Sequence, residues 1–128
     1  MSAAEIDSKY EVYKELQGDI QKLYTMKQTS LSQFNENTLV KGELDLLAED
    51  DSVFKLVGPA LMKVDLGEAI SNVAKRLEFI ESEITKLDNQ IAVKQGEQTK
   101  VGDEVKVLQS ALQRNAASAA QQIADEVS

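Results

Sequence analysis

The residues in this chain best suited to metal chemistry are the carboxylates of Asp45, Glu49, Asp50 and Asp51. Carboxylate oxygens are preferred ligands of hard cations such as Ca²⁺ and Mg²⁺. Their spacing does not follow the twelve-residue loop of an EF-hand, and four acidic residues so close together are also typical of a solvated helix end. We therefore expect the acidic run to end a helix and not to bind a metal ion.

Other catalytic chemistry has little support in the sequence. Glu81 and Glu83 are two residues apart, which places them on different sides of a helix and not as a facing acid–base pair. The chain has no histidine and no cysteine, so the commonest general base and the thiol nucleophile are both missing. It also lacks the glycine-rich phosphate loops GxxxxGK[ST] and GxGxxG. We expect no enzyme activity and no cofactor.

The composition limits the possible partners. The formal net charge is -8, whereas nucleic-acid binding needs a basic surface, so we expect no nucleic-acid partner. No stretch approaches the roughly 18 apolar residues of a membrane span, and the N-terminus is acidic and lacks the apolar run of a secretory signal. We expect a soluble chain with no membrane partner, located inside the cell.

Two long helices are predicted from apolar residues that recur at alternating steps of three and four, the period of a coiled-coil seam. Helix one is expected over about 3–48, where its seam weakens at Lys27 and Ser30, and helix two over about 66–124, where Lys94 and Gln98 interrupt the ladder. The apolar members are Ile6, Tyr13, Leu16, Ile20, Leu23, Phe34 and Leu44, then Leu66, Ile70, Val73, Leu77, Ile80, Ile84, Leu87, Ile91, Val101, Val105, Leu108 and Leu112. We expect an antiparallel pair of helices in a single domain, 1–128, with a frayed, unpartnered segment after Leu112.

A β-hairpin over about 53–64 is predicted between the helices, with its turn at Gly58-Pro59. We expect glycine there to adopt the extended conformation imposed before proline. Both faces of this hairpin are apolar, and a lone two-stranded ribbon is marginal in water, so other chains must cover it. The residues expected at the subunit interface are Val53, Phe54, Leu56, Val57, Leu61, Met62 and Val64.

Apolar and aromatic residues near the two ends of the chain have two interpretations. In the first they are ordinary coiled-coil core, with Tyr13 on the seam and Tyr10 beside it. In the second, frayed helix ends expose them as an adaptable surface for client proteins. The residues that the second interpretation assigns to client binding are Ile6, Tyr10, Tyr13, Val107, Leu108 and Leu112.

The middle of the chain resembles the beta-type subunits of the prefoldin family, and within it the subunit 6 branch. The first part of the resemblance lies in Gln33-Phe-Asn-Glu-Asn37, Val40, Glu43-Leu44, Leu47, Val53-Phe-Lys-Leu-Val-Gly-Pro59 and Leu61. The second part, similar to subunit 6, lies in Leu66-Gly-Glu-Ala69, Asn72-Val73, Lys75-Arg-Leu77, Ile80 and Glu83-Ile84.

The resemblance implies a mainly α fold, a long two-helix coiled coil whose hairpin joins those of other subunits in a β-barrel. It also implies a cytoplasmic hexamer of two alpha-type and four beta-type subunits. Such a complex holds unfolded proteins, notably actin and tubulin, without ATP and passes them to the group II cytosolic chaperonin. The alternative from the residues alone is a structural or tethering coiled-coil subunit of another complex, in which the hairpin is only a turn between helices.

Overall fold

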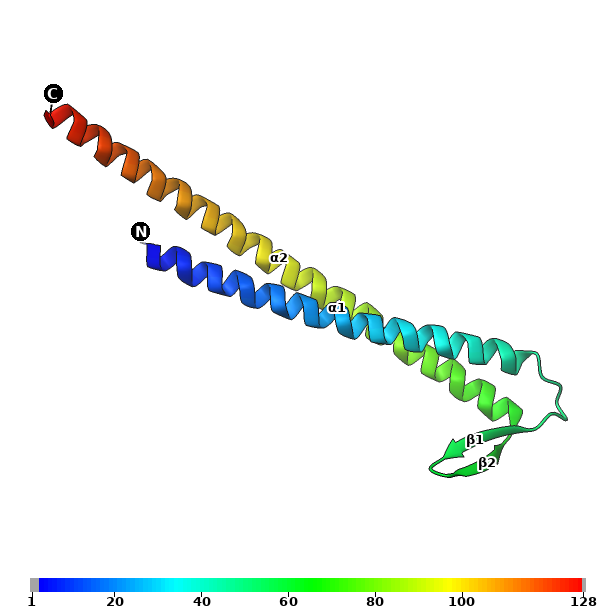
Figure 1. Cartoon of the computed structure of the whole chain (residues 1–128). Helices are drawn as coiled ribbons and strands as arrows, with labels where there is room; N and C mark the ends of the chain where they lie inside the picture. The colour runs from blue at the N-terminus through cyan, green and yellow to red at the C-terminus, as the bar shows by residue number, and fades with distance from the viewer. Residues whose placement is uncertain (1–2, 128) are drawn as a thin grey trace. The chain divides into compact units, whose positions relative to one another are not determined.

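The computed structural model describes residues 3–127, and its elements follow in the order α1, β1, β2, α2 (Figure 1). Helix α1 spans Ala3–Asp45 and helix α2 spans Leu66–Val127. Strands β1 (Val53–Val57) and β2 (Ala60–Val64) pair antiparallel in a two-stranded sheet. The predicted fold class, two long helices joined by a β-hairpin, is confirmed.

The contacts of the chain divide it into two compact units, each containing part of α1 and part of α2. Unit 1 comprises the residues up to Leu23 and those from Gln90 onward, and unit 2 comprises Tyr24–Asn89 with the hairpin. In unit 1, Leu16 and Ile20 of α1 are buried, as is Ile91 of α2. In unit 2 the buried residues are Leu44, Ile80 and Leu87. All six lie on the predicted seams; the single-domain organisation stays a prediction.

Three polar residues on the predicted seams, Lys27, Lys94 and Gln98, have partners on the opposite helix. In unit 1 the Gln98 amide donates a hydrogen bond to the Gln17 side-chain oxygen at 2.6 Å, and Lys94 lies 3.9 Å from Asp19. In unit 2 the Lys27 ammonium forms an ion pair with Asp88 at 2.7 Å. A lysine can cover the seam with its aliphatic stem while its charge reaches the flank. In unit 1, Gln17 pairs with Gln98 and Asp19 with Lys94, so residue numbers increase along α1 while those of their partners decrease along α2. The two helices of unit 1 are therefore antiparallel.

Helix α1 ends at Asp45, earlier than the predicted end near residue 48. The acidic run follows the helix and organises a turn. The Asp51 carboxylate accepts a hydrogen bond from the Ala48 N–H at 2.7 Å, and the Asp51 N–H donates to the Ala48 carbonyl at 3.0 Å. Aspartate side chains compete in this way with helical hydrogen bonds, which is why the helix stops before these residues. The start of α2 is as predicted, since Asp65 accepts a hydrogen bond from the Glu68 N–H at 3.1 Å.

The hairpin turn differs from the predicted conformation. Val57 pairs directly with Ala60, so Gly58 and Pro59 form a two-residue loop. Gly58 has φ of 59°, which is left-handed and not extended, so the predicted extended glycine was wrong. Proline holds φ near -65° and therefore excludes a type I′ turn, which needs positive φ at both positions. The turn is type II′, whose twist suits a hairpin and whose first position requires glycine.

Helix α2 continues as regular helix to Val127, so the predicted fraying after Leu112 was wrong. Its side chains from Leu112 to Val127 are exposed. Good helix formers occupy much of this stretch, with alanine at six of the positions between 111 and 124. Propensity therefore maintains the helix where packing does not.

Candidate interaction surfaces

The strand register sorts the hairpin side chains onto two faces, because directly paired residues point the same way. Phe54 pairs with Lys63 and Leu56 with Leu61, which makes one face, called here the Phe54 face. The second face, called the Val57 face, consists of Val53, Lys55, Val57, Ala60, Met62 and Val64. Both faces carry apolar side chains, as predicted from the sequence.

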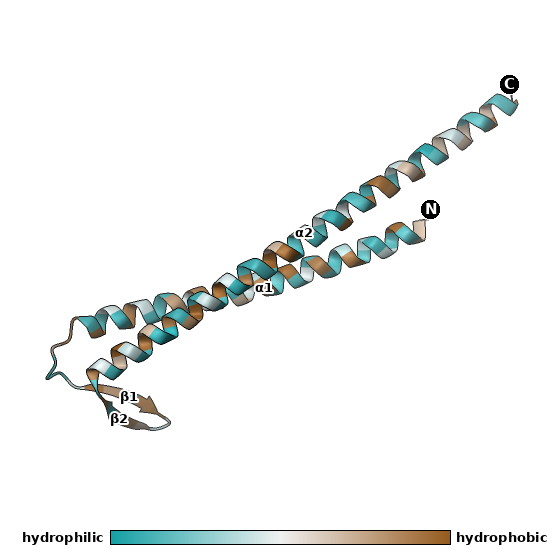
Figure 2. Ribbon diagram, turned by 180° about the vertical axis from the view of Figure 1, so that it is seen from behind, coloured by the Kyte–Doolittle hydropathy of each residue, from teal (hydrophilic) through white to brown (hydrophobic). Residues whose placement is uncertain are grey.

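Both hairpin faces are bare in the isolated chain. On the Phe54 face Leu56 and Leu61 are 69% and 68% exposed, and on the Val57 face Met62 is 56% exposed. Only Val53 and Val64, next to the helices, are half-buried. Figure 2 shows hydrophobic colour over much of β1 and on part of β2. Exposed apolar residues concentrated in this way are typical of a surface that another protein covers.

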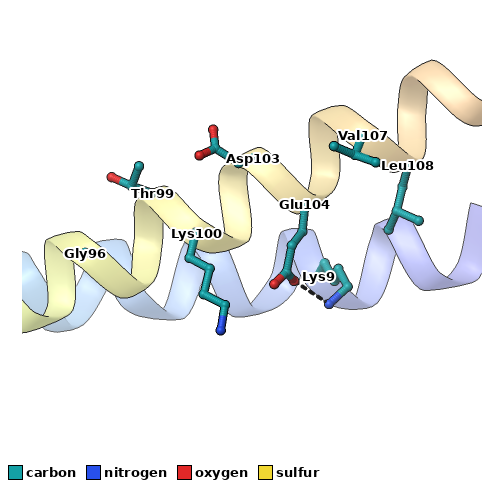
Figure 3. Close-up of a pocket in the computed structure, with 8 residues that line it drawn as sticks. All are labelled: Lys9, Gly96, Thr99, Lys100, Asp103, Glu104, Val107 and Leu108. Atoms are coloured by element: carbon teal, nitrogen blue, oxygen red, sulfur yellow. Dashed lines mark hydrogen bonds and ion pairs between the residues drawn. The ribbon is translucent and has the colours of Figure 1, made fainter.

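A second surface lies in unit 1, in a groove of about 650 Å³ called here the terminal groove (Figure 3). It is lined by Lys9, Gly96, Thr99, Lys100, Asp103, Glu104, Val107 and Leu108. Glu104 and Leu108 point toward α1, whereas Thr99 and Asp103 point away from it. Of the six residues predicted for client binding, this groove brings together only Val107, which is exposed, and Leu108, which is half-buried on the seam.

The two nearby tyrosines have different environments. Their rings stack with centroids 6.3 Å apart and planes at 4°. Tyr10 is about half exposed and lies beneath the Lys14 ammonium at 5.0 Å from the ring centroid. Tyr13 is half-buried against α2, where a Cβ built on Gly102 would be 3.3 Å from its Cε2. Gly102 thus admits the Tyr13 ring, which supports the core interpretation for Tyr13. Ile6 is also half-buried, whereas Leu112 is exposed.

The close approach at Gly102 leads to a prediction with a matched control. Gly96→Ala should stabilise α2 by about 1 kcal/mol, because alanine is the better helix former and nothing lies within 4 Å of the new Cβ. Gly102→Ala should bring no such gain, because the Tyr13 ring must move. Hydrogen exchange of the surrounding α2 amides should slow about fivefold in the first variant only. Equal slowing in both variants would contradict the Tyr13–Gly102 packing.

An ion pair that the sequence analysis missed closes one side of the terminal groove. The Lys9 ammonium lies 2.6 Å from the Glu104 carboxylate, and the hydrogen bond it donates lowers the pKa of Glu104 below its ordinary value. The charge of Lys9 adds to the effect, and Lys100 contributes less. Lys9 is spaced by three from Ile6 and by four from Tyr13, so it lies on the seam itself. A lysine at a seam position faces the opposite helix, so the spacing of Lys9 could have predicted an acidic partner on α2.

The Lys9–Glu104 pair gives a prediction about pH. Because folding lowers the pKa of Glu104, the pair contributes stability above the ordinary pKa, and this contribution is lost as the pH falls through the lowered value. A ¹³C NMR titration of Glu104 should show the lowered pKa in the wild-type chain and a return toward the ordinary value in Lys9→Met. Lys14→Met, on the same helix but paired with Glu11, should leave the Glu104 titration unchanged. Identical Glu104 titrations in wild type and Lys9→Met would refute the assignment.

Within residues 3–127, no group of three or more His, Cys, Asp or Glu side chains is placed to hold a metal ion. Asp45 of the acidic run instead pairs with Lys41 at 3.1 Å. None of the helices in the described part of the chain combines the length and the hydropathy needed to cross a bilayer.

Comparison with known proteins identifies the family. The family described as "Prefoldin subunit" matches residues 8–123. This chain belongs to the prefoldin family. It is 38% identical to the probable prefoldin subunit 6 of Caenorhabditis briggsae over 123 residues, which are 96% of each protein. It is 42% identical to human prefoldin subunit 6 over 86 residues, which are 67% of each protein.

A prefoldin of known structure has the same fold. The crystal structure of the prefoldin beta subunit from Thermococcus strain KS-1 matches 80% of this chain and 90% of that chain, with a TM-score of 0.76 at 17% identity. The predicted membership in the prefoldin family, with relatives of the subunit 6 type, is confirmed. The chain is a prefoldin chaperone subunit that assembles with other prefoldin subunits.

Proposed function

We propose that this prefoldin subunit joins two alpha-type and further beta-type subunits through its hairpin, in a cytoplasmic hexamer that holds unfolded proteins. Its clients are proteins such as actin and tubulin, which the complex delivers to the group II chaperonin. No catalytic step is involved. The observation that carries the proposal is the hairpin, which exposes large apolar side chains on both faces.

The physical argument for assembly rests on the area that water would otherwise contact. Fully burying a leucine, phenylalanine or methionine side chain contributes about 1.5–3 kcal/mol, and the hairpin offers several. Its strand edges also carry unpaired backbone groups that accept further strands. Strands from neighbouring subunits satisfy both requirements, which is why a sheet or barrel shared between chains is the expected form.

The argument for holding clients rests on multiple weak contacts. Tyr10, Val107 and Leu112 expose apolar surface near the ends of the chain without forming an enclosed pocket. Such surfaces bind weakly alone, but several tethered in one complex act at a high effective concentration. The sequence contains no phosphate-binding loop, which agrees with binding and release without ATP.

The test is reconstitution of the prefoldin complex with and without this subunit. We expect the complete complex to suppress aggregation of denatured actin without ATP, followed by light scattering, and to release the actin to purified chaperonin. Mixtures without this subunit should neither assemble nor protect. Full protection without it, or a complete complex that assembles but protects no client, would favour the tethering alternative.

A further inference from the structure

Unit 2 contains a continuous groove between one flank of the helix pair and the Val57 face of the hairpin. Neither coiled-coil pairing nor pairing of the two strands assigns a role to this groove. It consists of two adjoining grooves, of about 350 and 450 Å³, which share Val40 and Arg76. We call it the Arg76 groove; its main lining residues are Val40, Leu44, Lys55, Val64, Arg76 and Phe79.

The helical side of this groove is a second ladder on α2, offset from the seam. Ala69, Asn72, Arg76 and Phe79 follow one another at steps of three and four, so they share one flank of the helix. Phe79 is 65% exposed, and a side chain of this size contributes strongly to binding when a partner buries it. This flank therefore presents one exposed aromatic side chain, Phe79, one helical turn from Arg76.

Two basic residues line the groove, Arg76 and Lys55, and neither forms an ion pair within the described residues. Among residues 3–127, no carboxylate lies within 4.0 Å of the side-chain nitrogens of Arg76 or Lys55. Glu36, which also lines the groove, is not within that distance of Arg76. An arginine on an apolar surface binds carboxylates through paired hydrogen bonds and is enriched where proteins meet. The groove therefore fits a segment that carries both an apolar side chain and a carboxylate.

We propose that the Arg76 groove receives the acidic segment that leads into the hairpin of an adjacent prefoldin subunit. In this chain the equivalent segment is Glu49–Phe54, with consecutive carboxylates followed by apolar strand residues. The inference rests on the proposed assembly through hairpins: Lys55 and Val64 of the Val57 face also line the groove, so a strand that covers this face borders the groove. Contact between subunits then extends beyond the sheet onto the flank of α2, and Arg76 selects the neighbour by charge.

The first test compares two neighbouring basic residues in the reconstituted complex. Arg76→Glu places a negative charge in the groove and should weaken incorporation of this subunit about tenfold, measured by native mass spectrometry over a concentration series. Lys75→Glu makes the same charge change one residue away, outside the groove, and should leave incorporation unchanged. Equal effects of the two substitutions would overturn the proposal, because they would reflect net charge only.

The second test locates the occupant directly. A photo-crosslinking phenylalanine analogue replaces Phe79 in the groove or, as a control, Val93, which is 60% exposed on α2 but lines no part of the groove. In the assembled complex, position 79 should crosslink to the acidic segment before a neighbour's hairpin, identified by mass spectrometry, and position 93 should not. Crosslinks from position 79 only within its own chain, only to a second copy of it, or only to added denatured actin would each overturn the proposal.

The hairpin variant Val57→Glu/Met62→Glu separates this inference from the proposed function. If that variant still assembles fully, assembly through the hairpin is wrong, and the inference that rests on it fails as well. If that variant fails to assemble while Arg76→Glu incorporates normally and position 79 gives no crosslink to a neighbour, only the Arg76 groove inference fails.

Discussion

With Val57 and Met62 both replaced by glutamate, this chain should no longer enter the prefoldin complex, while α1 and α2 still form. Both residues lie on the Val57 face and are about half exposed in the isolated chain, so the substitutions disturb little within the chain itself. In the assembled sheet each carboxylate would be buried without a partner. An uncompensated buried charge costs about 3–5 kcal/mol, which is a hundredfold or more in affinity per substitution.

The measurement is the mass of the reconstituted complex by light scattering, with far-ultraviolet circular dichroism to follow the helices. Met26→Glu/Val93→Glu provides a matched control, because it replaces the same two residue types at similar exposure outside the hairpin. The control variant should assemble normally. An unchanged mass for the hairpin variant would show that the hairpin does not hold the complex together.

Removing the residues before Leu16 and those after Val101 should leave assembly of the complex intact but abolish protection of the client. The truncation leaves unit 2 and its hairpin intact and keeps the Gln17–Gln98 and Asp19–Lys94 contacts. It removes the terminal groove with its Lys9–Glu104 pair, and with it every residue predicted for client contact. Because weak contacts act together, loss of the whole set should reduce protection far more than loss of any one.

The assay is the light scattering of denatured actin diluted into the truncated or complete complex, together with the mass of each complex. Removing only the residues after Leu112 is the appropriate control, since it shortens α2 but retains all six predicted client residues. That shorter deletion should protect almost as well as the complete chain. If the longer truncation protects equally well, client contact lies elsewhere on the complex.

Much of this architecture could be predicted because it depends on local periodicity. Steps of three and four between apolar residues predicted both helices and all six buried positions, since a helix brings such residues onto one side. Successive side chains of a strand point to opposite faces, so the apolar residues between Val53 and Val64 likewise predicted a hairpin that is apolar on both faces. The ends of elements were less certain. Helix α1 ends at Asp45 because individual hydrogen bonds of Asp51 stabilise a turn there, and a pattern averaged over many residues does not resolve them.

The sequence alone therefore determined the elements, their apolar surfaces and the family. Each of these depends on the types and spacing of residues that are close together along the chain. Only the tertiary structure decided which distant residues meet. The Lys9–Glu104 pair joins positions 95 residues apart, and Gly102 matters because it faces Tyr13. The Arg76 groove likewise exists because the hairpin returns beside the flank of α2. Such contacts depend on the register between the helices and on the placement of the hairpin, which many side chains set together.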